Sequence, residues 1–392
     1  MKNFTTLFLL SLFVATNAQQ KNTVKPKDVP VIELSGKPYD RGFQLGQTYK
    51  TETAALYKRW KEDLANSLQQ DADSIIDDFY QNTHFQAALQ KWTPDLLDEI
   101  KGLAAGSGQS YKDVYCFQLM DEFWVYANKK MHGEKHHCSG LGIAAQDGNP
   151  TYISQNLDAP NYMNGAQILI HLVAYKNHPE QYILSAAGLL ALNGVNANGI
   201  GLTVNTLMDL QASDDGLPVF AMIRGILKQK NIKDALAFVQ NVKHASGQNY
   251  IIGNADSVYD FEASSNKVVR YIPDPKNPKI VFHTNHAVAN DDIKPWYKGR
   301  VYKDSRIRFD AIKNRLEAKN VNLNVATVET TLRSKDDANT PICRPFGANE
   351  YVFTFSSVIF TLGKNPTVQL TNGSPDQADY VLHTFNNNNK KD

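Results

Sequence analysis

Cys138 is the side chain in this sequence best placed to act as a nucleophile. It follows a polar, charged stretch (residues 129–137) and begins a segment with the texture of β-strands. A thiol becomes a good nucleophile only when a base removes its proton. Cleavage of the peptide bond between His137 and Cys138 would create such a base, because a free α-amino group has a pKa of about 7.7–8.0. The alternative is a structural cysteine, since unpaired cysteines are commonly buried.

A turn signal after Cys138 predicts a charged partner for it. The run DGNP at residues 147–150 separates two strand-like segments and so indicates a hairpin. If the turn is centred on Gly148, antiparallel pairing places Asp158 opposite Cys138. The Cβ atoms of directly opposed residues lie about 4.5–5.5 Å apart. A carboxylate at that place would orient and stabilise a protonated amine or another cationic partner.

Other polar residues stand in or beside apolar segments further along the chain. Asn205 lies inside the strand-like segment 200–207, and Asn285 ends another such segment. An asparagine amide can donate to the oxyanion of a tetrahedral intermediate, although a turn-forming or capping asparagine is the alternative. Arg306 and Arg308 share the first turn of a predicted helix. We expect one of them to face solvent and the other to be a fixed guanidinium in a site.

The hydrophobic pattern is helical before Cys138 and strand-like after it, and these elements must position the residues named above. Residues 39–126 show mainly helical spacing, clearest at 49–64, 96–103 and 111–126. After Cys138 the pattern changes to strands, predicted at 141–145, 151–156, 168–175, 182–187, 200–207, 250–253, 258–263, 267–272, 279–284, 351–362 and 367–370. Helices are predicted between them at 219–230, 232–242 and 305–318. Runs of strands and runs of helices favour an α+β fold with antiparallel sheets.

The N-terminus is typical of a signal peptide. Lys2 precedes an apolar run at residues 4–14, and Ala18 offers a small residue for cleavage. We therefore predict export to the periplasm or the exterior, with a mature start near Gln19. A buried element at the true N-terminus is the alternative. No later stretch has transmembrane length, so no integral membrane segment is expected in the mature chain.

Charge and cysteine content exclude some functions. A formal net charge of +1 and the lack of a lysine or arginine block argue against an electrostatic nucleic-acid binder. The three cysteines are too few for a disulfide scaffold, and their odd number leaves at least one thiol unpaired. A disulfide between Cys116 and Cys343 stays open.

In combination, these segments resemble the acyl-coenzyme A:6-aminopenicillanic acid acyltransferase family. This family is a branch of the N-terminal-nucleophile (Ntn) hydrolases related to choloylglycine (bile salt) hydrolases and penicillin V acylases. The resemblance extends over about residues 31–384 and rests on motifs in the same order: Pro38–Gly46 (PYDRGFQLG), Cys138–Gly140 (CSG), Gln155–Asp158 (QNLD), Gly194–Asn205, His283–His286 (HTNH) and Ser305–Phe309 (SRIRF).

The resemblance implies a four-layer αββα sandwich activated by self-cleavage between His137 and Cys138. It divides the chain into a signal peptide (1–18), a helical propeptide region (19–137) and a catalytic region (138–392). It implies Cys138 as nucleophile, Asp158 and Arg308 beside the thiol and amine, and Asn285 in the oxyanion hole, with possible support from Asn205 and Asn156. No metal or cofactor is implied.

Two positions depart from the family pattern. His137 stands before the expected cut, where a small or acidic residue is usual. Ala159 and Pro160 follow Asp158, where an aromatic residue is common. The substrate pocket beside Asp158 is therefore expected to differ from that of the family.

The function expected from these observations is hydrolysis of a small linear amide through a thioester on Cys138, or transfer of its acyl group. Hydrolysis is favoured because acyl-coenzyme A is scarce outside the cytoplasm, and the propeptide fragment could stay associated. A phospholipase B-like lipid hydrolase of the same superfamily is one alternative, and a non-catalytic binding protein is another. A metal-binding module would use His132, His136, His137 and Cys138.

Overall fold

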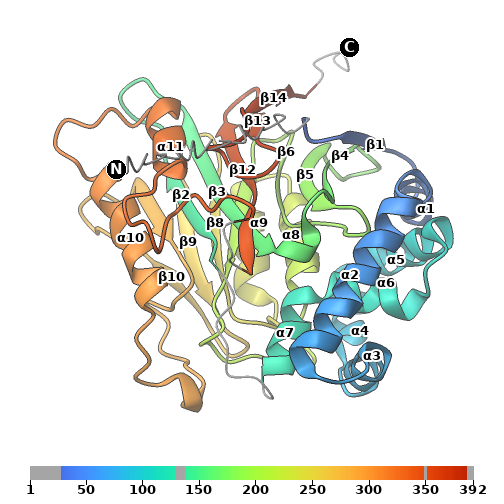
Figure 1. Ribbon diagram of the computed structural model, residues 1–392. Coiled ribbons are helices and arrows are strands. Elements are labelled where there is room, and N and C mark those ends of the chain that lie inside the picture. The colour runs from blue at the N-terminus through green and yellow to red at the C-terminus, as the bar shows by residue number, and fades with distance from the viewer. Residues whose placement is uncertain (1–27, 129–136, 348–350, 386–392) are drawn as a thin grey trace, which may run out of the picture.

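The computed structural model describes residues 28–128, 137–347 and 351–385. Two β-sheets pack face to face, and helices cover both outer faces (Figure 1). This arrangement confirms the α+β sandwich with helical outer layers that the sequence predicts. The predicted signal peptide and most of the polar stretch before Cys138 lie outside the described residues.

The larger sheet has eight strands in the order β1-β4-β5-β6-β7-β8-β9-β10. Within the two sheets of the described chain, every strand pairing is antiparallel except the parallel pair of β1 and β4. The strands are β1 (Val31–Leu34), β4 (Gln167–Leu172), β5 (Gln181–Ala186), β6 (Asn193–Asn196), β7 (Gly201–Thr206), β8 (Gln248–Gly253), β9 (Val258–Ala263) and β10 (Val268–Tyr271).

The smaller sheet carries the hairpin that begins after Cys138. It has six strands in the order β11-β2-β3-β12-β13-β14. They are β2 (Ser139–Ile143), β3 (Thr151–Pro160), β11 (Ile280–His283), β12 (Val352–Leu362), β13 (Thr367–Leu370) and β14 (Val381–Thr384). Strands β2 and β3 face β7 and β8 across the interior.

Helices form the outer layers of the sandwich. On the larger sheet, α8 (Val219–Leu227) packs against β6 and β7, and α9 (Ile232–Asn241) packs against α8. On the smaller sheet, α10 (Lys303–Leu316) contacts β2 and β11, and α11 (Val325–Leu332) contacts β3. A second apolar core fills the space under α10 and α11, with Leu141 and Phe282 on its sheet side and Ile312 and Leu332 on its helix side.

The N-terminal helices gather beside the sandwich (Figure 1). They are α1 (Pro38–Thr48), α2 (Lys50–Leu68), α3 (Ala72–Gln81), α4 (Phe85–Trp92), α5 (Pro94–Ser107), α6 (Tyr111–Gln118) and α7 (Met120–Asn128), and short 3₁₀ turns lie at Asn161–Met163 and Pro295–Tyr297. The sequence predicts one helix over 111–126, but α6 ends at Gln118 and α7 begins at Met120. None of the helices in the described chain is long and apolar enough to cross a membrane.

The glycines of the PYDRGFQLG segment let α1 and α5 touch backbone to backbone. A Cβ atom on Gly42 would lie 1.9 Å from the carbonyl oxygen of Glu99, and one on Gly102 would lie 2.0 Å from that of Tyr39. Both distances are far inside van der Waals contact, so no larger residue fits at either place. One of the motifs that carries the family resemblance therefore has a packing role.

A buried ion cluster joins these helices to the sandwich. Glu99 on α5 accepts hydrogen bonds from Arg41 on α1 at 2.9 Å and from both terminal nitrogens of Arg224 on α8 at 2.8 and 3.0 Å. All three side chains are almost completely buried. Burial alone would raise the pKa of Glu99, but Arg224 and then Arg41 outweigh it and lower that pKa to about 2.

The hairpin after Cys138 forms, but its register differs by one residue from the prediction. Asp147 and Gly148 both have positive φ (50° and 78°), as a two-residue type I′ turn requires. The centre of the turn therefore lies between these residues and not on Gly148. Ser139 pairs with Asn156, so continuing the register places Leu157, not Asp158, opposite Cys138.

Four short elements escaped the sequence prediction. Strands β1, β6 and β14 have four residues each, and α11 has eight. Length alone does not explain these misses, because β10, β11 and β13 also have four residues and lie in predicted segments. Cys116 and Cys343 do not form a disulfide in this structure, since both are buried and free.

The ion cluster around Glu99 predicts a large stability effect. Glu99→Gln leaves the buried Arg41 and Arg224 without their carboxylate, which should lower the free energy of unfolding by about 3–5 kcal/mol. The exposed Glu52→Gln on α2 is the matched control and should change it by about 0.5 kcal/mol or less. Urea denaturation of both variants measures the difference, and equal midpoints would contradict the cluster's role.

The same cluster predicts an acid-sensitive stability. The pKa of Glu99 is about 2 in the folded protein against an ordinary value of 4.5, so its contribution is complete above about pH 4.5. That contribution should fall as the pH drops from about 4.5 towards 2, by about 3 kcal/mol in total. Unfolding measured across this range should show a smaller loss in Glu99→Gln than in the wild type.

Candidate active site

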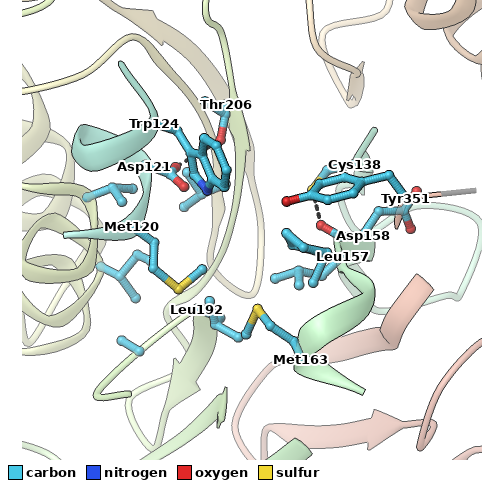
Figure 2. Close-up of a pocket in the computed structure, with 16 residues that line it drawn as sticks. Met120, Asp121, Trp124, Cys138, Leu157, Asp158, Met163, Leu192, Thr206 and Tyr351 are labelled. Carbon is cyan, nitrogen blue, oxygen red and sulfur yellow. Dashed lines mark hydrogen bonds between the residues drawn. The ribbon is translucent and has the colours of Figure 1, made fainter. Parts of the chain in front are cut away.

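Cys138 lies immediately before β2 and lines a cavity of about 180 Å³ (Figure 2). Its side chain is buried, and its Sγ donates to the backbone carbonyl oxygen of Asp158 at 3.7 Å. Burial, followed by the charge of Asp158, raises the pKa of the Cys138 thiol to about 12. In the intact chain the sulfur is therefore a protonated thiol at neutral pH.

The guanidinium of Arg308 holds the backbone on both sides of the peptide bond predicted to be cut. Its Nη1 donates to the carbonyl oxygens of His137 at 2.6 Å and of Cys138 at 2.7 Å. The same nitrogen lies 3.0 Å from Ser139 Oγ. Arg308 comes from the first turns of α10 and is completely buried, whereas Arg306 is exposed. The structure therefore resolves which arginine of this helix faces the site.

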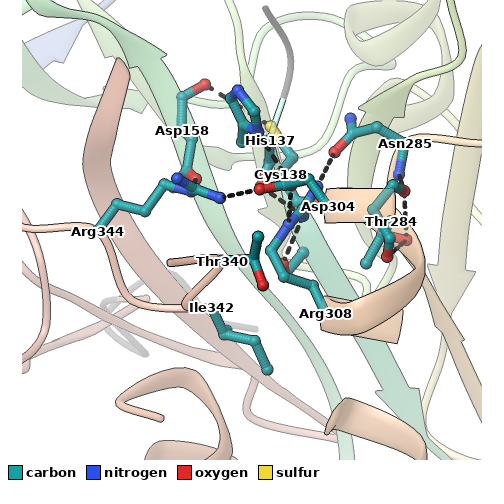
Figure 3. A network of polar contacts seen from close by, with 12 residues as sticks. His137, Cys138, Asp158, Thr284, Asn285, Asp304, Arg308, Thr340, Ile342 and Arg344 are labelled. Atoms are coloured by element: carbon teal, nitrogen blue, oxygen red, sulfur yellow. Dashed lines mark hydrogen bonds and ion pairs between the residues drawn. The ribbon is translucent and has the colours of Figure 1, made fainter. Parts of the chain in front are cut away.

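Asp304 connects Arg308 to the side chain of His137 (Figure 3). Its Oδ1 accepts from Arg308 Nε at 2.8 Å and lies 3.1 Å from His137 Nδ1. Burial would raise the pKa of Asp304, but the hydrogen bond from His137 and the charge of Arg308 hold it well below its usual value. Because an ionised carboxylate can only accept, Nδ1 is the nitrogen of His137 that carries a proton.

Asp158 is held by the loop before β12 and by β12 itself. Its Oδ1 accepts from Thr354 Oγ1 at 2.8 Å, and its Oδ2 lies 3.4 Å from Arg344 Nε. Arg344 also donates to Asp304 at 2.6 Å, so one chain of ion pairs links the two carboxylates. Burial outweighs the attraction of Arg344 and raises the pKa of Asp158 to about 7. This carboxyl can therefore gain or lose a proton near neutral pH.

Asn285 completes the group. Its backbone N–H donates to Ser305 Oγ at 2.8 Å, its Oδ1 accepts from Arg308 at 3.1 Å, and its Nδ2 donates to the carbonyl oxygen of Thr206 at 3.1 Å. An amide nitrogen has two hydrogens. One of them is left without a partner among the described residues and could be offered to an oxyanion.

Cys138, Asp158, Asn285 and Arg308 are thus brought together, but Asn205 and Asn156 have other contacts. Asn205 lies between the sheets, where it accepts from Gln155 at 2.8 Å and donates to the His283 carbonyl oxygen at 3.1 Å. The amide of Asn156 donates to two backbone carbonyl oxygens beyond β3, at 2.7 and 2.9 Å. Neither side chain lines the cavity, which is also true of Asn285 and Arg308. Asn205 and Asn156 differ in that they connect separate parts of the backbone and do not contact Arg308.

Sequence reasoning missed three residues of the site. Asp304 lies four residues before Arg308 on one helix face, a spacing that indicates an ion pair. Ser305 is visible in the sequence only as the first residue of the motif SRIRF. Arg344 lies in an irregular loop and carries no local signal, because tertiary folding alone brings it to Asp158.

The cavity itself is mainly apolar and is shared between the two sides of the predicted cut. Helix α7 contributes to it before Cys138, and β3, β7 and α8 contribute after it. Its apolar lining includes Met120, Trp124, Leu157, Met163, Leu192 and Ile223. Among the described residues, no group of three or more His, Cys, Asp or Glu could hold a metal ion. His132 and His136, which the metal-binding alternative needs, lie outside the described residues.

Comparison with known proteins gives one family match. The model of a family described as "Acyl-coenzyme A:6-aminopenicillanic acid acyl-transferase" matches residues 145–377, which is more than half of the chain. Cys138 lies just before the matched range. No curated protein matches the sequence.

Solved structures are similar to parts of the chain at low identity. An N-acylethanolamine-hydrolyzing acid amidase ortholog from Caenorhabditis elegans shares 16% identity over 57% of this chain and 92% of its own, with a TM-score of 0.40. A conjugated bile acid hydrolase from Clostridium perfringens shares 11% over 64% and 97%, with a TM-score of 0.42. A penicillin V acylase from Agrobacterium tumefaciens shares 12% over 60% and 82%, with a TM-score of 0.40.

The contacts of Arg308 predict that replacing it destabilises the fold much more than replacing the neighbouring Arg306. Arg308→Met removes the common donor of the backbone around Cys138 and leaves Asn285 Oδ1 without its hydrogen bond. We expect the free energy of unfolding to fall by about 2–4 kcal/mol. The matched variant Arg306→Met, on the exposed side of α10, should cost about 0.5 kcal/mol or less. Thermal and urea unfolding test this, and equal losses in both variants would contradict the placement of Arg308.

Proposed function

The chain belongs to the acyl-coenzyme A:6-aminopenicillanic acid acyltransferase family, and from this premise we propose that it is a self-processing amide hydrolase whose nucleophile is Cys138. The N-terminal cysteine would be created by cleavage after His137. The acyl group of a linear amide would then pass through a thioester on the cysteine sulfur. Hydrolysis is our preferred outcome, and transfer to an acceptor amine uses the same intermediate.

One observation carries this proposal. Arg308 Nη1 lies 2.6 Å from the carbonyl oxygen of His137, which belongs to the peptide bond expected to be cut. A cation at that distance polarises the carbonyl and stabilises the negative charge that develops when a nucleophile adds to its carbon. The thiol of the next residue is the nucleophile closest along the chain. A structural cysteine needs no such arrangement around the preceding carbonyl.

Self-cleavage proceeds through an ester-like intermediate. The thiol of Cys138 loses its proton, for which the carboxyl of Asp158, with a pKa of about 7, is our candidate acceptor. The sulfur bonds to the carbonyl carbon of His137, the carbon–nitrogen bond breaks, and the nitrogen takes a proton. Water then hydrolyses the thioester. The products are a carboxylate on His137 and a free thiol and α-amino group on Cys138.

Turnover uses the new α-amino group as the base. It removes the thiol proton, the sulfur attacks the amide carbonyl of the substrate, and the leaving nitrogen receives a proton from the ammonium that has formed. The unpartnered hydrogen of Asn285 Nδ2 is our candidate donor to the oxyanion, together with a backbone N–H. Water releases the acyl group as a carboxylic acid and restores the thiol.

The fragment before the cut would remain a working part of the enzyme. It contributes Met120 and Trp124 to the cavity, and Glu99 anchors it to Arg224 on the far side of the cut. Loss of the fragment would therefore open the cavity and leave the buried Arg224 without its carboxylate partner. We propose that both fragments stay together after cleavage, and that the protein acts outside the cytoplasm after removal of its signal peptide.

A lipid-directed hydrolase is the second candidate. It is favoured by the apolar lining of the cavity, which would also suit a fatty acyl chain. Stimulation of activity by a lipid–water interface would favour the lipid hydrolase, whereas full activity on a soluble amide would favour the amide hydrolase.

Intact mass spectrometry tests the cleavage directly. Purified wild type should consist of two fragments that separate at the bond between His137 and Cys138, and Cys138→Ala should remain one chain. Cys116→Ala is the matched control, because Cys116 is also a buried free thiol and should leave cleavage unchanged. The fragments should elute together in size-exclusion chromatography until urea is added.

A folded, uncut wild type would exclude the self-processing mechanism. The variant Cys138→Ser separates processing from turnover, because a hydroxyl can support the acyl shift but is a weaker nucleophile. We expect this variant to cleave itself slowly and to lose amidase activity.

A further inference from the structure

Asp121 places a negative charge on the wall of the cavity across from Cys138 (Figure 2). It lies in the first turn of α7. Its Oδ2 accepts from Thr206 Oγ1 at 2.8 Å and from Gln248 Nε2 at 2.9 Å. Both donors are neutral, so the charge itself is not compensated by them.

Among the described residues, no cation lies in the cavity wall to balance this charge. The described lining contains no lysine, arginine or histidine. The other carboxylate in its wall, Asp158, has Arg344 as its partner, but no described residue forms an ion pair with Asp121. No described residue donates to the second oxygen of Asp121 either, and its surroundings include the apolar side chains of Met120 and Trp124. An ionised group in such a wall is costly to cover with an apolar ligand.

From this charge we propose that the substrate's acyl group is apolar along its length and carries a cation, such as an ammonium, at the end that reaches Asp121. The proposal rests on the function proposed above, which places the substrate carbonyl at Cys138. The acyl group then extends along the apolar wall formed by residues such as Leu157 and Leu192. A neutral acyl group would desolvate Asp121 without compensation, and an acidic one would be repelled.

Matched substrates test this assignment. Nitroanilides of aminobutanoic, aminohexanoic and aminooctanoic acid carry the ammonium at three distances from the carbonyl. Unsubstituted acyl nitroanilides of the same lengths are the neutral controls. We expect kcat/KM to favour the ammonium compound about tenfold or more at the best length, because close opposite charges in a desolvated site couple strongly.

Two variants separate recognition from structure. Asp121→Asn keeps the size of the side chain and should reduce the preference for the ammonium substrate about tenfold or more. Activity on the neutral substrate should stay equal or rise, because the charge that this substrate would desolvate is gone. Asp98→Asn removes an exposed carboxylate of the same fragment and should leave the preference unchanged. Equal slowing of both substrates in Asp121→Asn would overturn the proposal, because it would mean that Asp121 only supports Thr206. A wild type that cleaves the neutral substrates as well at every length would also overturn it.

Activated esters of the same acyl groups test recognition of the acyl group independently of amide hydrolysis. Acylation of Cys138 is followed by the mass increase of the fragment that begins with it. Faster acylation by the ammonium esters without hydrolysis of any amide would support the acyl site and refute the amidase. Hydrolysis of amides with no preference for the ammonium compounds would support the amidase and refute the acyl site. If neither class of compound reacts, both proposals fail.

Discussion

The buried guanidinium of Arg308 is the interaction on which the rest of the site depends. It binds the backbone before β2, the asparagine after β11 and the start of its own helix, so three elements converge on one side chain. Desolvation lowers the pKa of Arg308, yet an arginine stays protonated in proteins, and the charge is balanced by Asp304. A rigid planar donor of this kind fixes directions as well as distances, which a lysine could not do.

A second cluster of buried charges fixes the N-terminal helices to the sandwich. Glu99 holds Arg41 and Arg224 far from Cys138, while the backbone contact of Gly42 and Gly102 sets the distance between the helices that carry them. Arg224 lies on α8, and Val219 and Ile223 of the same helix line the cavity. The packing of α1 on α5 and the shape of the cavity are therefore parts of one arrangement, although the motif PYDRGFQLG lies far from Cys138 in sequence.

The sequence predicts elements well wherever a local signal exists. The strands 258–263 and 367–370 match their observed bounds, and the turn at 147–150 identifies the hairpin. Register was wrong by one residue, because a sequence does not reveal whether a turn has one or two central residues. Arg344 and the charge of Asp121 in the cavity wall could not be found, since their partners and surroundings are created by chain segments distant in sequence. The roles of Cys138, Asp158, Asn285 and Arg308 stay predictions that the geometry supports.

The histidine before the predicted cut has a physical explanation that the family pattern does not supply. A small residue there would leave its carbonyl held by Arg308 alone, whereas the ring of His137 is also bound to Asp304 on the helix that carries Arg308. Burial lowers the pKa of His137, so the ring is neutral and donates to the ionised carboxylate without adding a second cation beside Arg308. One carboxylate thereby aligns the donor and the carbonyl it polarises. Asp304 thus binds both the ring of His137 and the guanidinium that contacts the His137 carbonyl oxygen, so the size of His137 does not prevent that contact.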